Sequence, residues 1–131
     1  MRTAFFPSGS RWDQNPYYKN LRQALMKQGV TCIIPPSDYL SGQWLWQQRR
    51  KVDVLHFHWI QYHYASPPAG SWGALLTFVS KLLYARLLGY RVVWTMHNGL
   101  PHESAPGIMD WVAGSVMSRS ANSVIVLCET G

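Results

Sequence analysis

Four polar side chains that could bind a ligand or move a proton follow one apolar run of the chain. Residues 92–96 read V-V-W-T-M, and His97, Asn98, His102 and Glu103 come after them. Imidazole gains or loses a proton near neutral pH, a carboxylate can act as an acceptor for a proton, and an amide adds hydrogen bonds. The run is rich in β-branched and aromatic residues and has glycine on both sides, which predicts a buried strand. Because ligands of open parallel sheets bind beyond the carboxyl ends of the strands, we expect a ligand site here.

Two further histidines lie on a second apolar run, residues 52–59, which reads V-D-V-L-H-F-H-W. As a strand, this run would place His56 and His58 on one face and Phe57 and Trp59 on the other. A His-x-His pair can chelate a metal, but no carboxylate or thiol stands close by in sequence to complete a ligand set. We therefore expect histidines that are buried or that face a ligand, and no metal.

The elements that must position these groups alternate between strands and helices. Gly29 and Gly89 end two helices, and Asn15-Pro16 is a typical helix start. The expected strands are 3–6, 30–34, 52–59, 92–96 and 123–127, and the expected helices are 15–28, 72–88 and 108–120, with a further amphipathic helix within 37–51. This order predicts a single α/β domain, with a Rossmann-like doubly wound, mainly parallel sheet of about five strands and helices on both faces.

The longest apolar stretch, residues 72–88, is shorter than the ~20 residues that span a bilayer. Because it is apolar nearly all round, we expect a helix that is buried on most of its surface. An interfacial helix is the alternative, in which Lys81 and Arg86 would meet lipid phosphates. The rings inserted among the headgroups would then be those of Trp72, Phe78 and Tyr84.

The composition is basic and aromatic, with a formal net charge of +6, seven Trp and seven Tyr. The charge favours anionic partners such as sugar phosphates or a membrane surface. Nucleic acid is disfavoured, because the basic residues are scattered and form no recognition pattern. Cys32 and Cys128 lie in apolar contexts and are expected to be reduced. Without a signal segment, the expected location is the cytoplasm, with attachment to the inner face of the membrane left open.

The loop after the first strand, Pro7-Ser8-Gly9-Ser10, could bring backbone N–H groups close to an anion. It contains neither a G-x-G-x-x-G nor a Walker pattern, so a dinucleotide-dependent oxidoreductase is disfavoured. An ordinary strand-to-helix turn is an equally good interpretation of this loop.

Four segments together resemble a known family. They are M-R-T-A-F-F-P-S-G-S with the following N-P-Y-Y-K-N-L-R-Q-A-L, then D-V-L-H-F-H-W-I, V-V-W-T-M-H-N-G-L-P-H-E and S-A-N-S-V-I-V-L-C-E-T. In this order they cover nearly the whole chain, which is similar to the N-terminal domain of GT-B glycosyltransferases, in particular the family-4-like retaining enzymes.

The resemblance implies transfer of a hexose from a nucleotide-sugar donor, the co-substrate, to a glycan or lipid-linked acceptor, with no cofactor and no metal. His97 would be the catalytic residue, reaching toward the transferred sugar. Gly9 and Ser10 would face the donor phosphates, and His58 and Trp59 would line the cleft floor. The acceptor side would be shaped by Asn98, His102 and Glu103.

The chain ends soon after the fifth expected strand, whereas the resembling enzymes continue into a donor-binding domain. The resemblance therefore implies that residues 1–131 alone are inactive. Expected partners are the acceptor, a second chain with the donor domain or another copy of this chain, and an anionic membrane. The alternative is a non-catalytic binding or assembly module, or a truncated fragment that kept the fold.

Overall fold

The computed structural model describes residues 1–8, 15–65, 71–97 and 107–127. Its centre is a five-stranded sheet in which all strands are parallel, in the order β2-β1-β3-β4-β5. The strands are β1 (Arg2–Phe6), β2 (Thr31–Ile33), β3 (Val54–Phe57), β4 (Arg91–Met96) and β5 (Ser123–Val126), and the helices are α2 (Pro16–Lys27), α3 (Gly42–Gln48), the short 3₁₀ helix η1 (Ile60–His63), α4 (Trp72–Leu87) and α5 (Ile108–Ser120).

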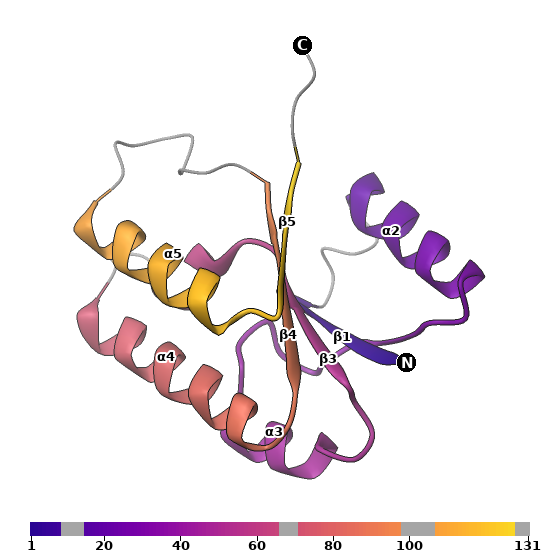
Figure 1. Ribbon diagram of the computed structural model, residues 1–131, viewed down its shortest axis with the longest axis horizontal. Helices are drawn as coiled ribbons and strands as arrows, with labels where there is room; N and C mark the ends of the chain where they lie inside the picture. Colours follow the sequence, from indigo (N-terminus) through magenta and orange to yellow (C-terminus); the bar gives the residue numbers. More distant parts are fainter. Residues whose placement is uncertain (9–14, 66–70, 98–106, 128–131) are drawn as a thin grey trace.

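The helices cover both faces of the sheet. In Figure 1, α2 lies on one face, and α3, α4 and α5 lie on the other. The central strands have buried residues toward both layers: Phe5 of β1 packs with Tyr18 of α2, while Phe6 and Phe57 belong to the larger core on the opposite face. This arrangement confirms the predicted Rossmann-like doubly wound α/β fold.

Local signals set the helix ends. The Asn15 side chain accepts a hydrogen bond from the Tyr17 backbone N–H at 3.0 Å, and Pro16 occupies the first helical position of α2. Ser71 caps α4 in the same way. Gly29 and Gly89 have φ values of 82° and 93°, in the left-handed region where glycine avoids the steric cost of a Cβ.

Most observed boundaries lie within one residue of the expected ones, and the larger differences are in β3 and in the segment around α3. β3 ends at Phe57 rather than at residue 59, so the alternation of faces does not extend to Trp59. The helix expected within 37–51 is confined to α3, where Ser41 accepts a hydrogen bond from the Trp44 N–H. Ser37 caps the backbone at Tyr39 before the helix begins.

The surface of α4 is more exposed than the sequence suggested. One stripe of α4 is buried against the sheet, namely Leu75, Phe78, Leu82 and Ala85. The outward stripe remains exposed, and it consists of Trp72, Leu76, Leu83 and Leu87. The expectation of a helix buried on most of its surface was therefore wrong. Apolar residues all round a helix do not reveal how many of its faces pack against other elements. In the described part of the chain, no helix is long and apolar enough to cross a membrane.

The sheet ends at β5, which is an edge strand in the described structure. Its apolar residues Val124, Ile125 and Val126 are exposed, as is Leu127 immediately after it. Trp94↔Val124 and Thr95↔Ile125 are register partners, so these exposed side chains project from both faces of the sheet. An unpaired edge with apolar groups on both faces is a surface on which another chain segment can pack.

Adjacent leucines on α4 test its orientation. Leu82 is 0% exposed and Leu83 is 51% exposed, and both stand inside the same helix. We expect Leu82→Ala to lower the free energy of unfolding by about 2–5 kcal/mol, because it leaves a cavity in the core. Leu83→Ala is the matched control and should change it by less than about 1 kcal/mol. Urea unfolding followed by circular dichroism measures both, and equal losses would contradict this orientation.

Candidate functional site

The carboxyl ends of β1, β3 and β4 meet where the strand order changes direction. The chain passes from β1 to β2 on one side, and β3 then lies on the other side of β1. In doubly wound sheets this switch point is where ligands bind. The histidines of the sequence analysis lie here, since His58 follows β3 and His97 follows β4.

Four rings form what we call the histidine cluster: His58, His97, Trp59 and Tyr17. His58 Nδ1 and His97 Nε2 are 3.1 Å apart and share a hydrogen bond. The indole of Trp59 stacks on His97, with ring centroids 4.3 Å apart and an interplanar angle of 14°. Tyr17, in the first turn of α2, meets His97 edge-on at 4.7 Å. The His97 ring is therefore held by three rings from two segments, namely the residues that follow β3 and the first turn of α2.

A second layer of contacts lies below the cluster. His56 Nε2 and Thr95 Oγ1 are 2.7 Å apart, which ties β3 to β4. The rings of His56 and His58 stack at 4.4 Å, and Phe5 stacks on His56 at 5.1 Å. The Trp94 indole donates a hydrogen bond to the His58 carbonyl at 3.2 Å. These contacts fix the backbone and the ring of His58, which in turn positions His97.

Burial keeps the imidazoles of this site uncharged. Burial, followed by the nearby His56 and His97 rings, lowers the pKa of His58 to about 2. Burial, with a smaller effect of His97, lowers the pKa of His56 to about 4. Burial also lowers the pKa of His97, which is more exposed. At neutral pH these three rings can donate or accept hydrogen bonds, but they carry no positive charge.

The hydrogen-bond pattern assigns a tautomer to the pair. Among the described residues, His58 Nε2 is buried and has no partner. In proteins, a buried N–H group that lacks an acceptor is rarer than a buried acceptor that lacks a donor. We therefore assign the proton of His58 to Nδ1, which donates a hydrogen bond to His97 Nε2. His97, being neutral, then carries its own proton on Nδ1. That nitrogen is the group which His97 can offer as a donor to a ligand.

The structure brings together only part of the expected site. His58, Trp59 and His97 are in mutual contact, as described above. His58 is 2% exposed, so it supports His97 from below instead of forming an open floor. Trp59 turns to the same side as His58 because β3 has already ended. The remaining expected residues, Gly9, Ser10, Asn98, His102 and Glu103, lie outside the described residues, as does Cys128.

Sequence reasoning missed Tyr17 and Thr95. Tyr17 belongs to the helix expected at 15–28, but no local pattern links it to His97. The signal was its position, because the first turn of the helix after β1 lies at the carboxyl edge of the sheet. Thr95 looked like an ordinary strand residue. Its role depends on the β3–β4 pairing, which no local pattern shows.

Among the described residues, no group of three or more His, Cys, Asp or Glu side chains is placed to hold a metal ion. Of the two cysteines, Cys32 is free and partly buried, and burial raises the pKa of its thiol. What the described cluster can do is donate and accept hydrogen bonds between neutral groups and pack aromatic rings against a ligand.

The buried histidines make stability dependent on pH. His63, on η1, joins His56 and His58, because burial and then nearby Lys81 lower the pKa of His63 to about 4. Unfolded histidines titrate near pH 6.5, so below that pH the unfolded chain binds more protons than the fold. The free energy of unfolding should therefore fall as pH falls, by roughly 1–2 kcal/mol per buried histidine from about pH 7 to about pH 5.

Urea unfolding over this pH range measures the effect. His56→Phe removes one of the titrating rings and should reduce the pH dependence by about one quarter to one third, because partly buried His97 also contributes. The carboxylate of Asp53 does not interfere, because its hydrogen bonds with Arg2 lower the pKa of Asp53. Its contribution to stability therefore changes only at more acidic pH than this range. A free energy of unfolding that stays constant over the range would contradict the assignment of neutral buried rings.

No protein-family model, curated protein or solved structure matches this chain. Its function therefore has to be inferred from the chemistry of the histidine cluster and from the surfaces that surround it.

Proposed function

We propose that this chain binds a sugar unit of a glycan or lipid-linked acceptor at the histidine cluster, as the acceptor-side domain of a GT-B-type glycosyltransferase. The observation that carries the proposal is the packing of neutral His97 between Trp59 and Tyr17, against His58, at the switch point of a parallel sheet. The sequence resemblance supports the same function, since its most specific segment contains His97.

The cluster suits a neutral ligand that has both polar and apolar surface. A sugar presents hydroxyl groups around a ring whose C–H bonds are apolar, and aromatic rings with a few placed polar groups match both. The rings that contact His97 belong to His58, Trp59 and Tyr17. None of them carries a charge at neutral pH, so the selectivity would come from hydrogen bonding and shape.

The same geometry suits glycosyl transfer. The reaction passes through an oxocarbenium-like state, which benefits from dipoles fixed before the reaction begins. His97 is held by three neighbouring rings, so its Nδ1–H can point to a sugar oxygen without reorganising. The N-terminal end of α2, at Tyr17, lies beside it and carries the positive end of the helix dipole, which favours a leaving diphosphate.

Transfer also requires a nucleotide-sugar site. In the proposal this site belongs to a donor-binding domain, carried by a longer form of this polypeptide or by a separate chain. Turnover that appears only when such a domain is added would support the transferase.

The second candidate function is a non-catalytic binding or assembly module. It gains support if sugar binds but no pairing with a donor domain gives turnover. The bare edge of β5 favours that candidate, because it offers a surface for another chain or another copy.

The exposed side of α4 and α5 supports a membrane-linked acceptor. Both helices pack against each other, and their exposed apolar residues are Trp72, Leu76, Leu83, Leu87, Ile108, Trp111 and Val112. The two helices carry the exposed Arg86 and Arg119 against the single acidic residue Asp110, while Lys81 of α4 lies toward the segment before α3. An apolar surface with excess positive charge fits the interface of an anionic bilayer.

Sugar binding tests the proposed site. We expect methyl hexosides to show saturation-transfer NMR signals with the protein, and His97→Ala to weaken binding about tenfold through the lost hydrogen bond. His97→Asn, whose amide N–H lies near the position of Nδ1, should retain more binding than His97→Gln, whose amide lies near Nε2. Trp59→Leu should also weaken binding, whereas Trp46→Leu, which removes an exposed ring on α3, should leave it unchanged. Binding insensitive to His97 and Trp59 would count against this site.

Vesicle sedimentation tests the membrane surface. We expect the protein to bind vesicles rich in phosphatidylglycerol better than phosphatidylcholine vesicles. The double change Leu76→Ser and Leu83→Ser should reduce binding about tenfold, because it removes apolar area from the interface. Its matched control is Met26→Ser with Ile34→Ser, two exposed apolar residues outside α4 and α5. Equal binding by both double variants would argue against this surface.

A further inference from the structure

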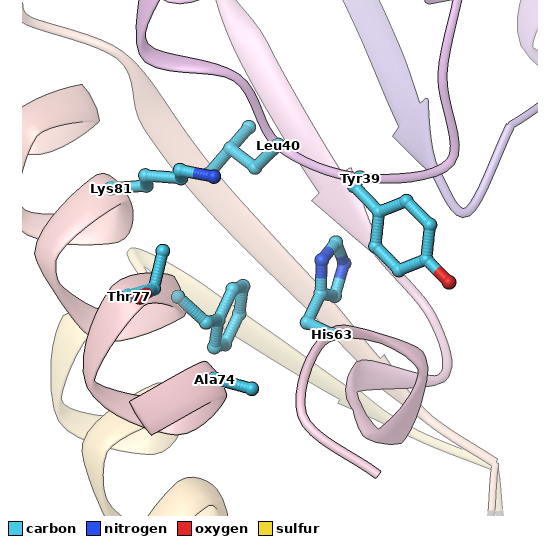
Figure 2. Close-up of a pocket in the computed structure, with 7 residues that line it drawn as sticks. Tyr39, Leu40, His63, Ala74, Thr77 and Lys81 are labelled. Atoms are coloured by element: carbon cyan, nitrogen blue, oxygen red, sulfur yellow. The ribbon is translucent and has the colours of Figure 1, made fainter. Parts of the chain in front are cut away.

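A buried imidazole nitrogen without a partner among the described residues belongs to a ring that lines a pocket on the opposite face of the sheet. The pocket has a volume of about 160 Å³. Its walls come from the segment before α3, from η1 and from the first turns of α4 (Figure 2). The lining residues are Tyr39, Leu40, His63, Ala74, Thr77, Phe78 and Lys81, and we call it the His63 pocket.

His63 is the buried polar group of this pocket. Its imidazole stacks on Phe78, with centroids 4.5 Å apart and an interplanar angle of 14°, and Tyr39 approaches it edge-on at 6.2 Å. His63 is 9% exposed, and among the described residues its Nε2 has no hydrogen-bond partner. A buried nitrogen without a partner costs free energy, so it calls for a water or ligand that satisfies it.

Lys81 is the charged group of the same pocket. Figure 2 shows its side chain extending from α4 toward Leu40, across the pocket from Tyr39. Among the described residues, the single ion pair joins Arg2 to Asp53 at the other end of the sheet. Lys81 therefore has no carboxylate partner among these residues. The lining contains no acidic side chain, and the Thr77 hydroxyl already donates its proton to the Gly73 carbonyl at 2.8 Å.

We infer that the His63 pocket binds a small carboxylic acid with a planar apolar body, of about the size of benzoate. The carboxylate would accept a hydrogen bond from the Lys81 ammonium and a second one from His63 Nε2–H, for which neutral His63 takes the tautomer protonated at Nε2 when the ligand binds. The apolar body would lie among Tyr39, Phe78 and Leu40. A cavity of about 150 Å³ admits a benzene ring, so the measured volume suits this size.

The pocket is independent of the histidine cluster. His63 and Phe78 pack against Phe57, a residue of the core on the α3–α5 face, whereas His58 and His97 lie on the α2 face. The sheet separates the two sites. The inference therefore does not rest on the proposed sugar binding, and either one can fail without the other.

Calorimetric titration of the unmodified protein with sodium benzoate, benzamide and sodium phosphate tests the inference. We expect benzoate to bind, and neutral benzamide to bind about tenfold more weakly, because it lacks the charge-assisted hydrogen bond. Phosphate should also bind more weakly than benzoate, since it leaves the aromatic wall unfilled. Equal affinity for benzoate and benzamide would overturn the inference, as would phosphate binding as tight as that of benzoate, or no benzoate binding.

Variants locate the binding. Lys81→Met should weaken benzoate binding about tenfold, whereas Lys19→Met, which removes an exposed charge on the α2 face, should not. Ala74→Leu should block the pocket, and Ala24→Leu, on the exposed side of α2, is its control for the larger side chain. In NMR spectra, benzoate should shift the ring signals of His63 and leave those of His97 unchanged. The reverse pattern, or equal effects of each variant and its control, would overturn the inference.

Discussion

The burial of imidazole rings beneath α2 is the constraint on which the rest of the site depends. His56 lies on β3 and His58 directly follows it, and both rings face α2 instead of water. A charged imidazole there would lose its hydration, so the rings stay neutral and need hydrogen-bond partners from the fold. β4 supplies them, because its pairing with β3 brings Thr95 beside His56 and His97 beside His58. The strand pairing thereby decides how His97 points.

The sequence was sufficient to predict the elements and their class because those signals are local. Asn15-Pro16, Gly29 and Gly89 act within one helical turn, and the apolar runs of β3 and β4 mark buried strands by composition alone. The strand-end rule pointed to His97 as a ligand-site residue, whereas His58 was expected within a strand that the structure ends at Phe57. Only the family resemblance placed His58 and His97 in the same cleft.

What could not be predicted depends on which elements become neighbours. Leu82 and Leu83 have the same chemistry and the same helical context, yet one is in the core and the other is exposed. The difference comes from the position of α4 between the sheet, α3 and α5. Tyr17 reaches His97 for the same kind of reason, because its place in the cluster follows from the order of β1 and β3 in the sheet. Sequence periodicity indicates which residues share one face of a helix or strand. Tertiary packing determines which of these faces becomes buried.

Among the described residues, two buried imidazole nitrogens without partners lie on opposite faces of the sheet, and the surroundings of each nitrogen suggest a different role. His58 Nε2 is enclosed by the rings of Phe5, Tyr18 and His56, and the other nitrogen of His58 already holds His97. The surrounding rings separate His58 Nε2 from any ligand. The missing hydrogen bond of this nitrogen is therefore best understood as a cost of positioning His97. His63 Nε2 belongs to a ring that lines a pocket together with Lys81, whose ammonium group has no carboxylate partner among the described residues. In our inference, one ligand satisfies both groups. An unsatisfied atom therefore indicates a binding site only where the structure also provides room and a second group that the same ligand would satisfy.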